Sequence, residues 1–301
     1  MLGRGILYGL RAAKAPSGTG NIFKSKVKAM SETTALKKPR LRRQQELVEH
    51  VVGTGFATAA DLAALAGVSL MTVHRDIDDL AGRGILRKVH GGVSALPSTV
   101  FEASSEIRMQ MQAQAKTALA HKALEFVEAG MSVMLDDSTT VLALARLLNK
   151  TGPLTVLTNY RQALEVLREN DDIRLIVIGG QYSRTHDSFI GLPTDSSVNS
   201  YAVDIVFQST STMGSEMTYH QEQDIVFMKR AMLKAGTRRI LMMDGSKVGR
   251  TSLHHFVPVS DFTDVIITDD VPAADIEAIA ANCKVHIAPL APHRPGHSDT
   301  P

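Results

Sequence analysis

The sequence predicts an α/β protein in two parts, a small helical domain followed by a larger domain on a Rossmann-like, mostly parallel sheet. Three observations lead to this prediction. A length of 301 residues is enough for two domains. Residues 40–96 show helical periodicity and end in a hairpin pattern. From residue 131 onward, short apolar segments alternate with helices, which is typical of a parallel sheet covered on both faces.

The composition is that of an ordinary globular chain. Hydrophobic residues make up 44% and charged residues 21%, which excludes a wholly disordered chain, a collagen and a coiled-coil rod. The single cysteine, Cys283, excludes an intrachain disulfide framework and a cysteine-rich zinc site, and it suits a reducing compartment. Because the longest apolar stretches have only the length of strands, we expect no membrane span and a cytoplasmic protein.

Charge is distributed unevenly along the chain. Residues 1–100 contain 15 Lys and Arg against 7 Asp and Glu, a balance of +8, and residues 101–301 contain 18 against 24, a balance of −6. The two balances add up to the net charge of +2. A basic front half and an acidic back half indicate that the front half meets a polyanion.

Composition shifts divide the chain into segments. Residues 1–30 contain six basic residues and no acidic one. An organelle transit peptide has this chemistry, but a disordered arm, or an upstream start with Met30 opening a shorter chain, is favoured. We expect a basic, disordered extension at 1–39, a first domain at 40–96, a linker at 97–112, a second domain at 113–288 and a disordered tail at 289–301.

Capping residues and glycines divide the first domain into three helices and a hairpin. Thr58 and Asp61 have the spacing of a capping box, and Ser69 suits the start of the next helix. Gly67 tolerates the left-handed conformation that ends a helix. We therefore expect helices over 41–52, 58–66 and 70–81, then a strand over 85–89, a turn at 90–92 and a returning strand.

The third expected helix has one apolar and one polar face. Val73, Ile77 and Leu80 fall within a narrow arc and face the core, while His74 and Arg75 fall on the opposite side. A polar helix held by a tight turn after another helix is the helix-turn-helix layout, which inserts the second helix into the major groove of DNA. Asp76 lies near the core side and is expected to pair with a nearby arginine. DNA contacts are expected from Arg42, Arg43, Ser69, Met71, Thr72, His74, Arg75, Arg87, Lys88 and His90.

Alternating strands and helices fill the second domain. Their apolar segments are too short to span a membrane and are interrupted by helices of about ten residues. Strands are expected at 132–135, 154–158, 173–178, 203–208, 239–243, 265–268 and 284–287, and helices at 114–127, 139–148, 161–169, 225–235 and 274–281.

Polar residues follow several of these strands. Ligands of open α/β sheets bind at the carboxyl ends of strands, and backbone N–H groups at a helix start bind anions. Hydroxyl groups and a lysine add donors, so a small polar anion such as a sugar phosphate fits these positions, with Asp244 also expected nearby. The expected effector-binding residues are Asp136, Ser138, Thr139, Thr140, Thr158, Asn159, Gly179, Gly180, Asp204 and Lys247.

Residues 68–77 and 84–92 carry a specific pattern. They resemble the signature V-S-x-x-T-I/V-R-R-D-L followed by G-x-L/I-x-R-x-H-G-G of the DeoR-type bacterial transcriptional regulators. His74 stands where the family usually has its first arginine, so no operator sequence can be carried over. The resemblance implies a winged helix-turn-helix domain and a regulator of a carbohydrate catabolism operon that binds double-stranded operator DNA, a repressor being favoured and an activator left open.

The second domain resembles the sensor domain of the same family, a fold related to ribose-phosphate isomerases and coenzyme A transferases. The resemblance extends over about residues 40–288 and implies a phosphorylated sugar or polyol as effector. Ser138 and the pair Gln208-Ser209 replace glycines of the family pattern. The matching segments are 136–140, 158–159, 179–180, 188–191, 228–231, 246–249 and 267–269. Lys247 or Arg184 is expected to offset the negative charge of Asp136 and Asp137. Glu222 or Asp224 is expected to be the acidic residue before the helix that contains Lys229.

Two other functions remain open at the level of sequence. A sugar-phosphate isomerase-like enzyme with an accessory DNA-binding module could use Asp136, Asp204 and Lys247 as acid–base groups, and the front domain could instead dock a protein. The histidines lack metal-site spacing and no nucleophile triad is apparent, so we expect no catalytic residue, no metal and no cofactor. Two-fold symmetric operators require at least two copies, so we expect a homo-oligomer, a dimer or a tetramer.

Overall fold

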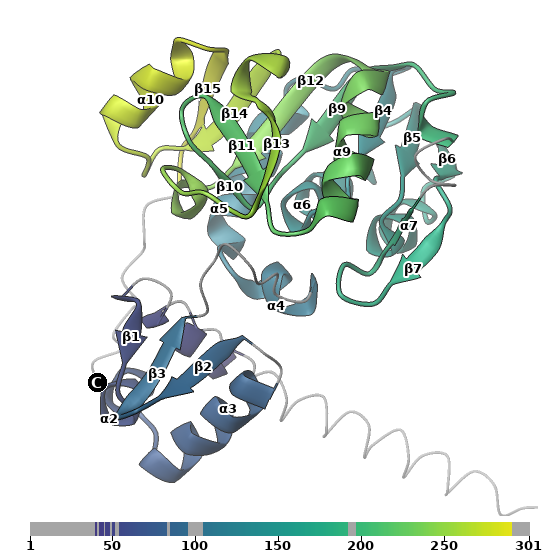
Figure 1. Ribbon diagram of the computed structural model, residues 1–301. Coiled ribbons are helices and arrows are strands. Elements are labelled where there is room, and N and C mark those ends of the chain that lie inside the picture. The colour runs from purple at the N-terminus through teal and green to yellow at the C-terminus, as the bar shows by residue number, and fades with distance from the viewer. Residues whose placement is uncertain are drawn as a thin grey trace, which may run out of the picture.

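The computed structural model describes two domains joined through a short helix (Figure 1). It describes residues 40, 42–44, 46–48, 50–51, 54–82, 85–95, 105–191 and 197–290. The expected extension at 1–39 lies outside these residues, as does the expected tail at 289–301 except for its first two residues. None of the helices in the described part of the chain combines the length and the apolar character needed to cross a bilayer.

The first domain has the expected helices and hairpin and one additional strand. Its elements are α2 (Ala59–Ala66), α3 (Leu70–Gly82), β2 (Leu86–Val89) and β3 (Gly92–Ala95), preceded by helical residues between positions 40 and 54. The additional strand β1 (Phe56–Ala57) pairs with β3, which gives the order β1-β3-β2. A strand of two residues has too little alternation to be recognised in the sequence.

Local capping chemistry fixes α2 and α3 as expected. The Thr58 side chain accepts a hydrogen bond from the Asp61 backbone N–H, and the Asp61 carboxylate accepts one from the Thr58 N–H. Gly67 ends α2 at φ +61°, and the Ser69 hydroxyl accepts from the Thr72 N–H at the start of α3. A core of Leu47, Val48, Val51, Leu62, Val73, Ile77, Leu80, Ile85, Leu86 and Val93 packs the helices against the hairpin.

The second domain is built on a seven-stranded parallel sheet. Its strand order is β15-β14-β12-β9-β4-β5-β6, and every neighbouring pair is parallel. The strands agree with the sequence prediction to within about one to three residues at their ends. They are β4 (Ser132–Leu135), β5 (Leu154–Thr158), β6 (Ile173–Val177), β9 (Val203–Gln208), β12 (Gly236–Met243), β14 (Asp264–Thr268) and β15 (Lys284–Ala288).

Helices cover both faces of this sheet. In β4, Val133 and Leu135 point into one hydrophobic cluster and Met134 into the other, as strand alternation requires. The first cluster contains residues of α5 (Ala113–Leu124), α6 (Thr139–Leu148) and α7 (Arg161–Leu167), and the second contains residues of α9 (Gln223–Ala235) and α10 (Ala273–Ala280).

Two smaller strand assemblies and one helix differ from the sequence prediction. The hairpin β7 (Gln181–Ser183) and β8 (Ser188–Ile190) and the small sheet β10 (Thr212–Met213), β11 (Met217–His220) and β13 (His254–Pro258) were not predicted, because their strands are short and polar. Within the expected linker at 97–112, Ser105–Gln110 form the helix α4, which was not predicted. Residues 97–104 lie outside the described part.

Candidate functional site

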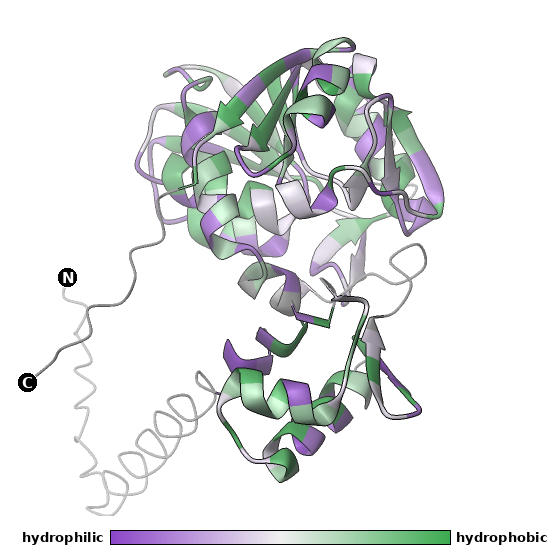
Figure 2. Ribbon diagram, turned by 90° about the vertical axis from the view of Figure 1, so that its left-hand side faces the viewer, coloured by the Kyte–Doolittle hydropathy of each residue, from purple (hydrophilic) through white to green (hydrophobic). Residues whose placement is uncertain are grey.

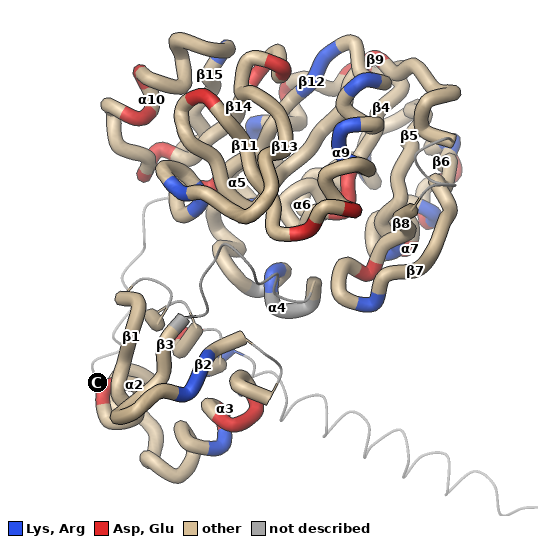
Figure 3. The backbone as a smooth tube through the Cα atoms, viewed as in Figure 1, with Lys and Arg blue, Asp and Glu red and all other residues tan. Residues whose placement is uncertain are grey.

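One face of α3 is exposed to solvent, and the opposite face packs into the core of the domain. Met71 is 66% exposed, and His74 and Arg75 are exposed beside it, while Val73 and Ile77 are buried. This division of the helix confirms the predicted core face. Of the ten residues expected to contact DNA, eight are exposed and two, Arg43 and Thr72, are half-buried. Figure 3 shows basic residues on both α3 and β2.

Asp76 ties α3 to the preceding helical segment. Its carboxylate is buried and accepts hydrogen bonds from Arg43 Nε at 2.6 Å, Gln44 Nε2 at 3.0 Å and Arg40 Nε at 3.3 Å. The prediction that Asp76 pairs with an arginine is therefore confirmed. Arg43 has an intradomain partner, whereas Arg42 is 83% exposed and pairs only weakly with Glu46, at 3.3 Å.

The hairpin extends the basic surface of α3. Arg87 and Lys88 on β2 and His90 in the following turn are exposed. Lys88 forms an ion pair with Asp78 of α3, which shows that the strand and the helix are neighbours. Gly91 has φ +84° and allows the tight turn. The helix and hairpin therefore form one continuous polar surface.

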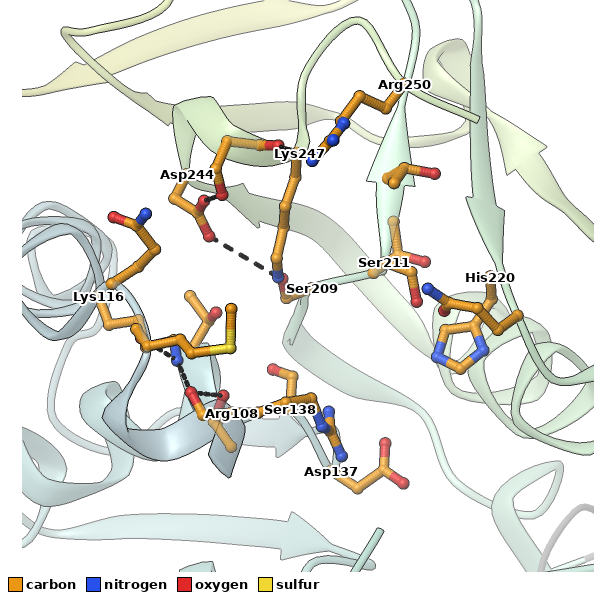
Figure 4. Close-up of a pocket in the computed structure, with 18 of the residues that line it drawn as sticks. Arg108, Lys116, Asp137, Ser138, Ser209, Ser211, His220, Asp244, Lys247 and Arg250 are labelled. Atoms are coloured by element: carbon orange, nitrogen blue, oxygen red, sulfur yellow. Dashed lines mark hydrogen bonds and ion pairs between the residues drawn. The ribbon is translucent and has the colours of Figure 1, made fainter. Parts of the chain in front are cut away.

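A cavity of about 200 Å³ lies at the carboxyl end of the central strands (Figure 4). It is bordered by the residues that follow β4, β9 and β12, because parallel strands direct their carboxyl ends to the same edge of the sheet. Eight hydroxyl side chains line it: Ser138, Thr139, Thr140, Ser209, Thr210, Ser211, Thr212 and Ser246.

The cavity wall has an excess of positive charge. Its lining contains five Lys and Arg side chains and two carboxylates, so the formal balance is 5 − 2 = +3. In Figure 4, Lys247 and Arg250 lie across the cavity from Arg108, Ser138 and Asp137. Such a wall favours an anionic ligand. The charged lining residues are Arg108, Lys116, Lys229, Lys247 and Arg250, with Asp137 and Asp244.

Lys229 is buried between two aspartates. Its ammonium group lies 2.5 Å from an Asp136 oxygen and 3.4 Å from an Asp137 oxygen. Burial acts to lower the pKa of Lys229, but the two carboxylates outweigh it and the pKa is raised. Burial likewise acts to raise the pKa of Asp137, but Lys229, His186 and the Ser188 hydroxyl hold that pKa well below its usual range. Lys229 and Asp137 are therefore both charged at neutral pH.

Asp136 forms hydrogen bonds with two loops that border the cavity. It is buried and accepts hydrogen bonds from the backbone N–H groups of Ser138 at 3.0 Å and Ser209 at 2.9 Å. The Ser138 hydroxyl caps α6 by accepting from the Val141 N–H. By contrast, the Thr140 hydroxyl oxygen is buried, lines the cavity region and has no partner within the described residues. It is free to bind a ligand at the start of α6.

The structure brings together only part of the expected effector site. Ser138, Thr139, Thr140 and Lys247 line the cavity. Asp136 stands behind it, in contact with Lys229. The other expected residues are not among those described as lining the cavity: Thr158, Asn159, Gly179, Gly180 and Asp204.

Sheet order explains why the residues that follow β5 and β6 do not line the cavity. β5 and β6 lie on the other side of β4 from β9 and β12. Asn159, which follows β5, donates to the Phe189 carbonyl of the β7–β8 hairpin at 2.9 Å, and the Thr158 hydroxyl accepts from the Tyr160 N–H at 3.1 Å. The expectation for Asp204 is wrong. It is the second residue of β9, at the amino end of the strand, where its carboxylate accepts from Ser132 and its pKa is lowered by these hydrogen bonds.

Several cavity residues carry no recognisable signal in the sequence. Arg108 lies in the expected linker, and His186 lies in the unpredicted β7–β8 hairpin. His186 Nε2 lies 3.0 Å from a Glu222 oxygen, which identifies Glu222 rather than Asp224 as the acidic residue near this wall. Lys229 entered the sequence analysis only through the family pattern. No cluster of residues suited to a metal ion occurs within the described ranges.

Comparison with known protein families matches both domains. A family model described as "DeoR C terminal sensor domain" matches residues 111–270, and one described as "DeoR-like helix-turn-helix domain" matches residues 43–99. The chain belongs to the DeoR family of transcriptional regulators. The winged helix-turn-helix domain and the α/β sensor domain of the sequence prediction are thus confirmed.

Individual relatives of this DeoR-family chain carry names of repressors. It is 30% identical over 233 residues to the lactose phosphotransferase system repressor of Streptococcus mutans, covering 75% of this chain and 91% of that one. It is 26% identical over 251 residues to the glycerol-3-phosphate regulon repressor of Escherichia coli K12, covering 82% and 97%. A solved D-ribose-5-phosphate isomerase in complex with phospho-erythronic acid aligns with a TM-score of 0.34 at 16% identity, covering 45% and 54%, and this weak likeness supports no conclusion.

Proposed function

We propose that the protein is a repressor of a carbohydrate catabolism operon, released or modulated by a phosphorylated sugar or polyol bound in the sensor cavity. The observation that carries this proposal is the cationic, hydroxyl-lined cavity at the carboxyl edge of the sheet, in a chain that begins with a helix-turn-helix domain. The names of the lactose and glycerol-3-phosphate repressors agree with such an effector.

The effector's phosphate is assigned to the side of the cavity formed by α6 and Lys247. The start of α6 presents backbone N–H groups, and the Thr140 hydroxyl there has no partner in the described residues. Lys247 Nζ lies 3.3 Å from the Ser209 hydroxyl and 3.8 Å from an Asp244 oxygen, a loose contact that a phosphate can replace. Asp137 and His186 then border the sugar hydroxyls.

On the DNA side, α3 is assigned to the major groove. Arg75 and His74 on its exposed face are placed to contact base edges, and Arg87, Lys88 and His90 on the hairpin are placed to contact phosphates. Arg42, Ser69, Met71 and Thr72 complete the surface, whereas Arg43 holds Asp76. A symmetric operator requires a homo-oligomer.

The effector assignment is tested by exchanging one lysine. D-ribose 5-phosphate, D-glucose 6-phosphate and sn-glycerol 3-phosphate are added to the full chain, and the thermal midpoint is measured. We expect at least one of them to raise the thermal midpoint, because a ligand at 100 times its Kd adds about 2.7 kcal/mol to the free energy of unfolding. We expect Lys247→Met to remove the shift of the midpoint. Lys234→Met, an exposed lysine on α9, is the control. A shift that survives Lys247→Met contradicts the assignment.

A regulator and an isomerase differ in turnover. The same ribose 5-phosphate sample is assayed for ribulose 5-phosphate. Since no acid–base group is assigned here to the reacting carbons, we expect no conversion above the buffer rate. Conversion that is abolished by Lys247→Met would instead support the enzyme with an accessory DNA-binding module.

A further inference from the structure

We infer that α4 and the two residues after it form part of the effector site and transmit its occupancy to the DNA-binding domain. This inference rests on the proposed function, because it supposes an effector and an operator. It assigns a ligand-binding role to Arg108 and a transmitting role to Met111, neither of which follows from the sequence.

The position of α4 connects the two domains. Figures 1 and 2 both place it between the sheet domain and the DNA-binding domain. Along the chain, residues 96–104 join the end of β3 to the start of α4. At its other end, Arg108, Met111 and Gln112 line the effector cavity. A ligand in the cavity therefore touches the far end of a segment that lies between the two domains.

The start of α4 is fixed to the sensor domain. Ser105 is buried, its hydroxyl lies 2.5 Å from the Tyr160 hydroxyl, and its N–H donates to the Thr185 carbonyl at 2.9 Å. Tyr160 is itself fully buried. This end cannot move without opening the sensor core, so any adjustment of α4 is concentrated at its cavity end.

The cavity end of α4 is held by groups that also face the ligand. Lys116 is buried and donates to the carbonyls of Arg108 and Met111, the latter at 2.6 Å. The Thr139 hydroxyl, in the first turn of α6, donates to the Arg108 carbonyl at 3.3 Å. A phosphate at the start of α6 attracts Lys116 and the Thr139 hydroxyl. Its binding therefore weakens their hydrogen bonds to the carbonyls of Arg108 and Met111.

Met111 links this junction to the other domain. It lines the cavity and also packs against the hydrophobic core of the DNA-binding domain. The next residue, Gln112, has φ +52°, a left-handed conformation that is uncommon for a residue with a side chain. The chain thus turns sharply at Gln112, between Met111, which contacts both domains, and the helix α5.

These contacts give a defined route for coupling. An anionic effector draws Arg108 and Lys116 toward the cavity, the turn at Gln112 is rearranged, and Met111 changes its packing against the DNA-binding domain. The effector then binds one arrangement of the junction more tightly than the other, which is the condition for a ligand to shift an equilibrium.

The first test compares two methionines of the same segment. Met109 packs against the sensor core, whereas Met111 packs against the DNA-binding core. DNA affinity of the full chain is measured on a duplex selected from a random pool, with and without D-ribose 5-phosphate, D-glucose 6-phosphate or sn-glycerol 3-phosphate. We expect at least one of these to change Kd by about fivefold or more in the wild type and in Met109→Ala. Because Met111 also lines the cavity, the compound is added to Met111→Ala until its thermal shift is saturated, and we expect the duplex Kd to stay unchanged at that concentration. A wild-type ratio in Met111→Ala would overturn the inference.

The second test needs no effector. Coupling is reciprocal, so bound DNA must alter the junction if the junction alters DNA binding. Hydrogen exchange at residues 108–116 is followed on adding the selected duplex. We expect a change in the wild type and in Met109→Ala, and none in Met111→Ala.

The outcomes separate this inference from the proposed function. A duplex that binds tightly but leaves exchange at 108–116 unchanged in the wild type overturns the inference alone. Failure to select any duplex overturns the proposed function and, with it, the inference. Failure of all three phosphates to affect the wild type contradicts the proposed effector class, and the exchange experiment then decides the coupling route.

Discussion

At the scale of single residues, charge burial organises the sensor domain. Lys229 and Asp136 are almost inaccessible to water, and Asp137 completes the group. Removing one partner of a buried ion pair leaves an uncompensated charge, which typically costs about 3–5 kcal/mol. Asp136 also receives two backbone N–H groups from the loops that border the cavity. The buried charges therefore help to fix the loops that border the cavity.

Stability at acid pH follows from Asp137. Its pKa in the folded protein is lowered relative to the unfolded chain, where an aspartate titrates near about 3.9. A lowered pKa stabilises the fold above the unfolded value, and this contribution is lost as the pH falls further. We expect the free energy of unfolding, measured by urea titration, to fall steeply below about pH 4.

The contribution of Asp137 can be isolated by substitution. Asp137→Asn should make the acid decline shallower than in the wild type, because the group that titrates has been removed. Asp171→Asn, at an exposed position, serves as the control and should leave the profile unchanged. An acid decline of the same steepness in Asp137→Asn would assign it to other carboxylates.

At the scale of elements, the orientation of α3 depends on one carboxylate. Asp76 collects hydrogen bonds from Arg40, Arg43 and Gln44 on the helical segment before α2. Packing of Val73 and Ile77 fixes which face of α3 is buried, and Asp76 adds a polar contact that fixes the helix against its neighbour. The acidic residue Asp76 in this helix therefore has a structural role, which is to hold α3 against the preceding helical segment.

Replacing Asp76 should weaken DNA binding without removing a DNA contact. In Asp76→Ala the guanidinium of Arg43 and the Gln44 amide lose their acceptor, so we expect a lower stability of the first domain, by about 1–3 kcal/mol, and a higher Kd for the selected duplex. Asp78→Ala removes an exposed carboxylate paired with Lys88 and should leave stability unchanged. Calorimetry and duplex binding measure both effects, and equal stability of the two variants would contradict the role given to Asp76.

At the scale of the whole molecule, charge is segregated by domain. Residues 1–100 carry +8 and residues 101–301 carry −6, yet the cavity within the acidic part is lined by more cations than carboxylates. An acidic balance disfavours nonspecific binding of residues 101–301 to DNA, while a cationic cavity wall favours an anionic ligand. This segregation agrees with the proposal that the chain binds DNA and an anionic effector at separate places.

Salt dependence should separate the two kinds of DNA contact. Lys88→Ala, which removes a proposed phosphate contact, should reduce the slope of log K against log salt by about 0.9 and weaken binding to all duplexes alike. Arg75→Ala should instead reduce the preference for the selected duplex over a scrambled one, by about 1–3 kcal/mol. Fluorescence anisotropy from low to moderate salt measures both quantities. Identical changes in slope and preference for the two variants would refute this division.

The sequence by itself determined the order of elements and the family. Periodicity, caps and glycines are local properties, so the helices α2 and α3 and the strands of the seven-stranded sheet were placed to within a few residues. The motifs 68–77 and 84–92 pointed to the DeoR family, which the family models confirm. Apolar runs as short as β4 are informative because a strand buried on both faces requires them.

Only the tertiary structure decided which residues share the cavity. Strand order lies in the hydrogen bonding between distant segments, so the sequence could not show that β4 separates β5 and β6 from β9 and β12. The predicted strand at 203–208 already placed Asp204 near the amino end of its strand, so its assignment to the effector site conflicted with that strand. The sequence also could not show the positions of Arg108 and Met111, which lie in a segment without periodicity and meet the cavity and the DNA-binding core only through folding. Long-range packing, which no local pattern encodes, places them there.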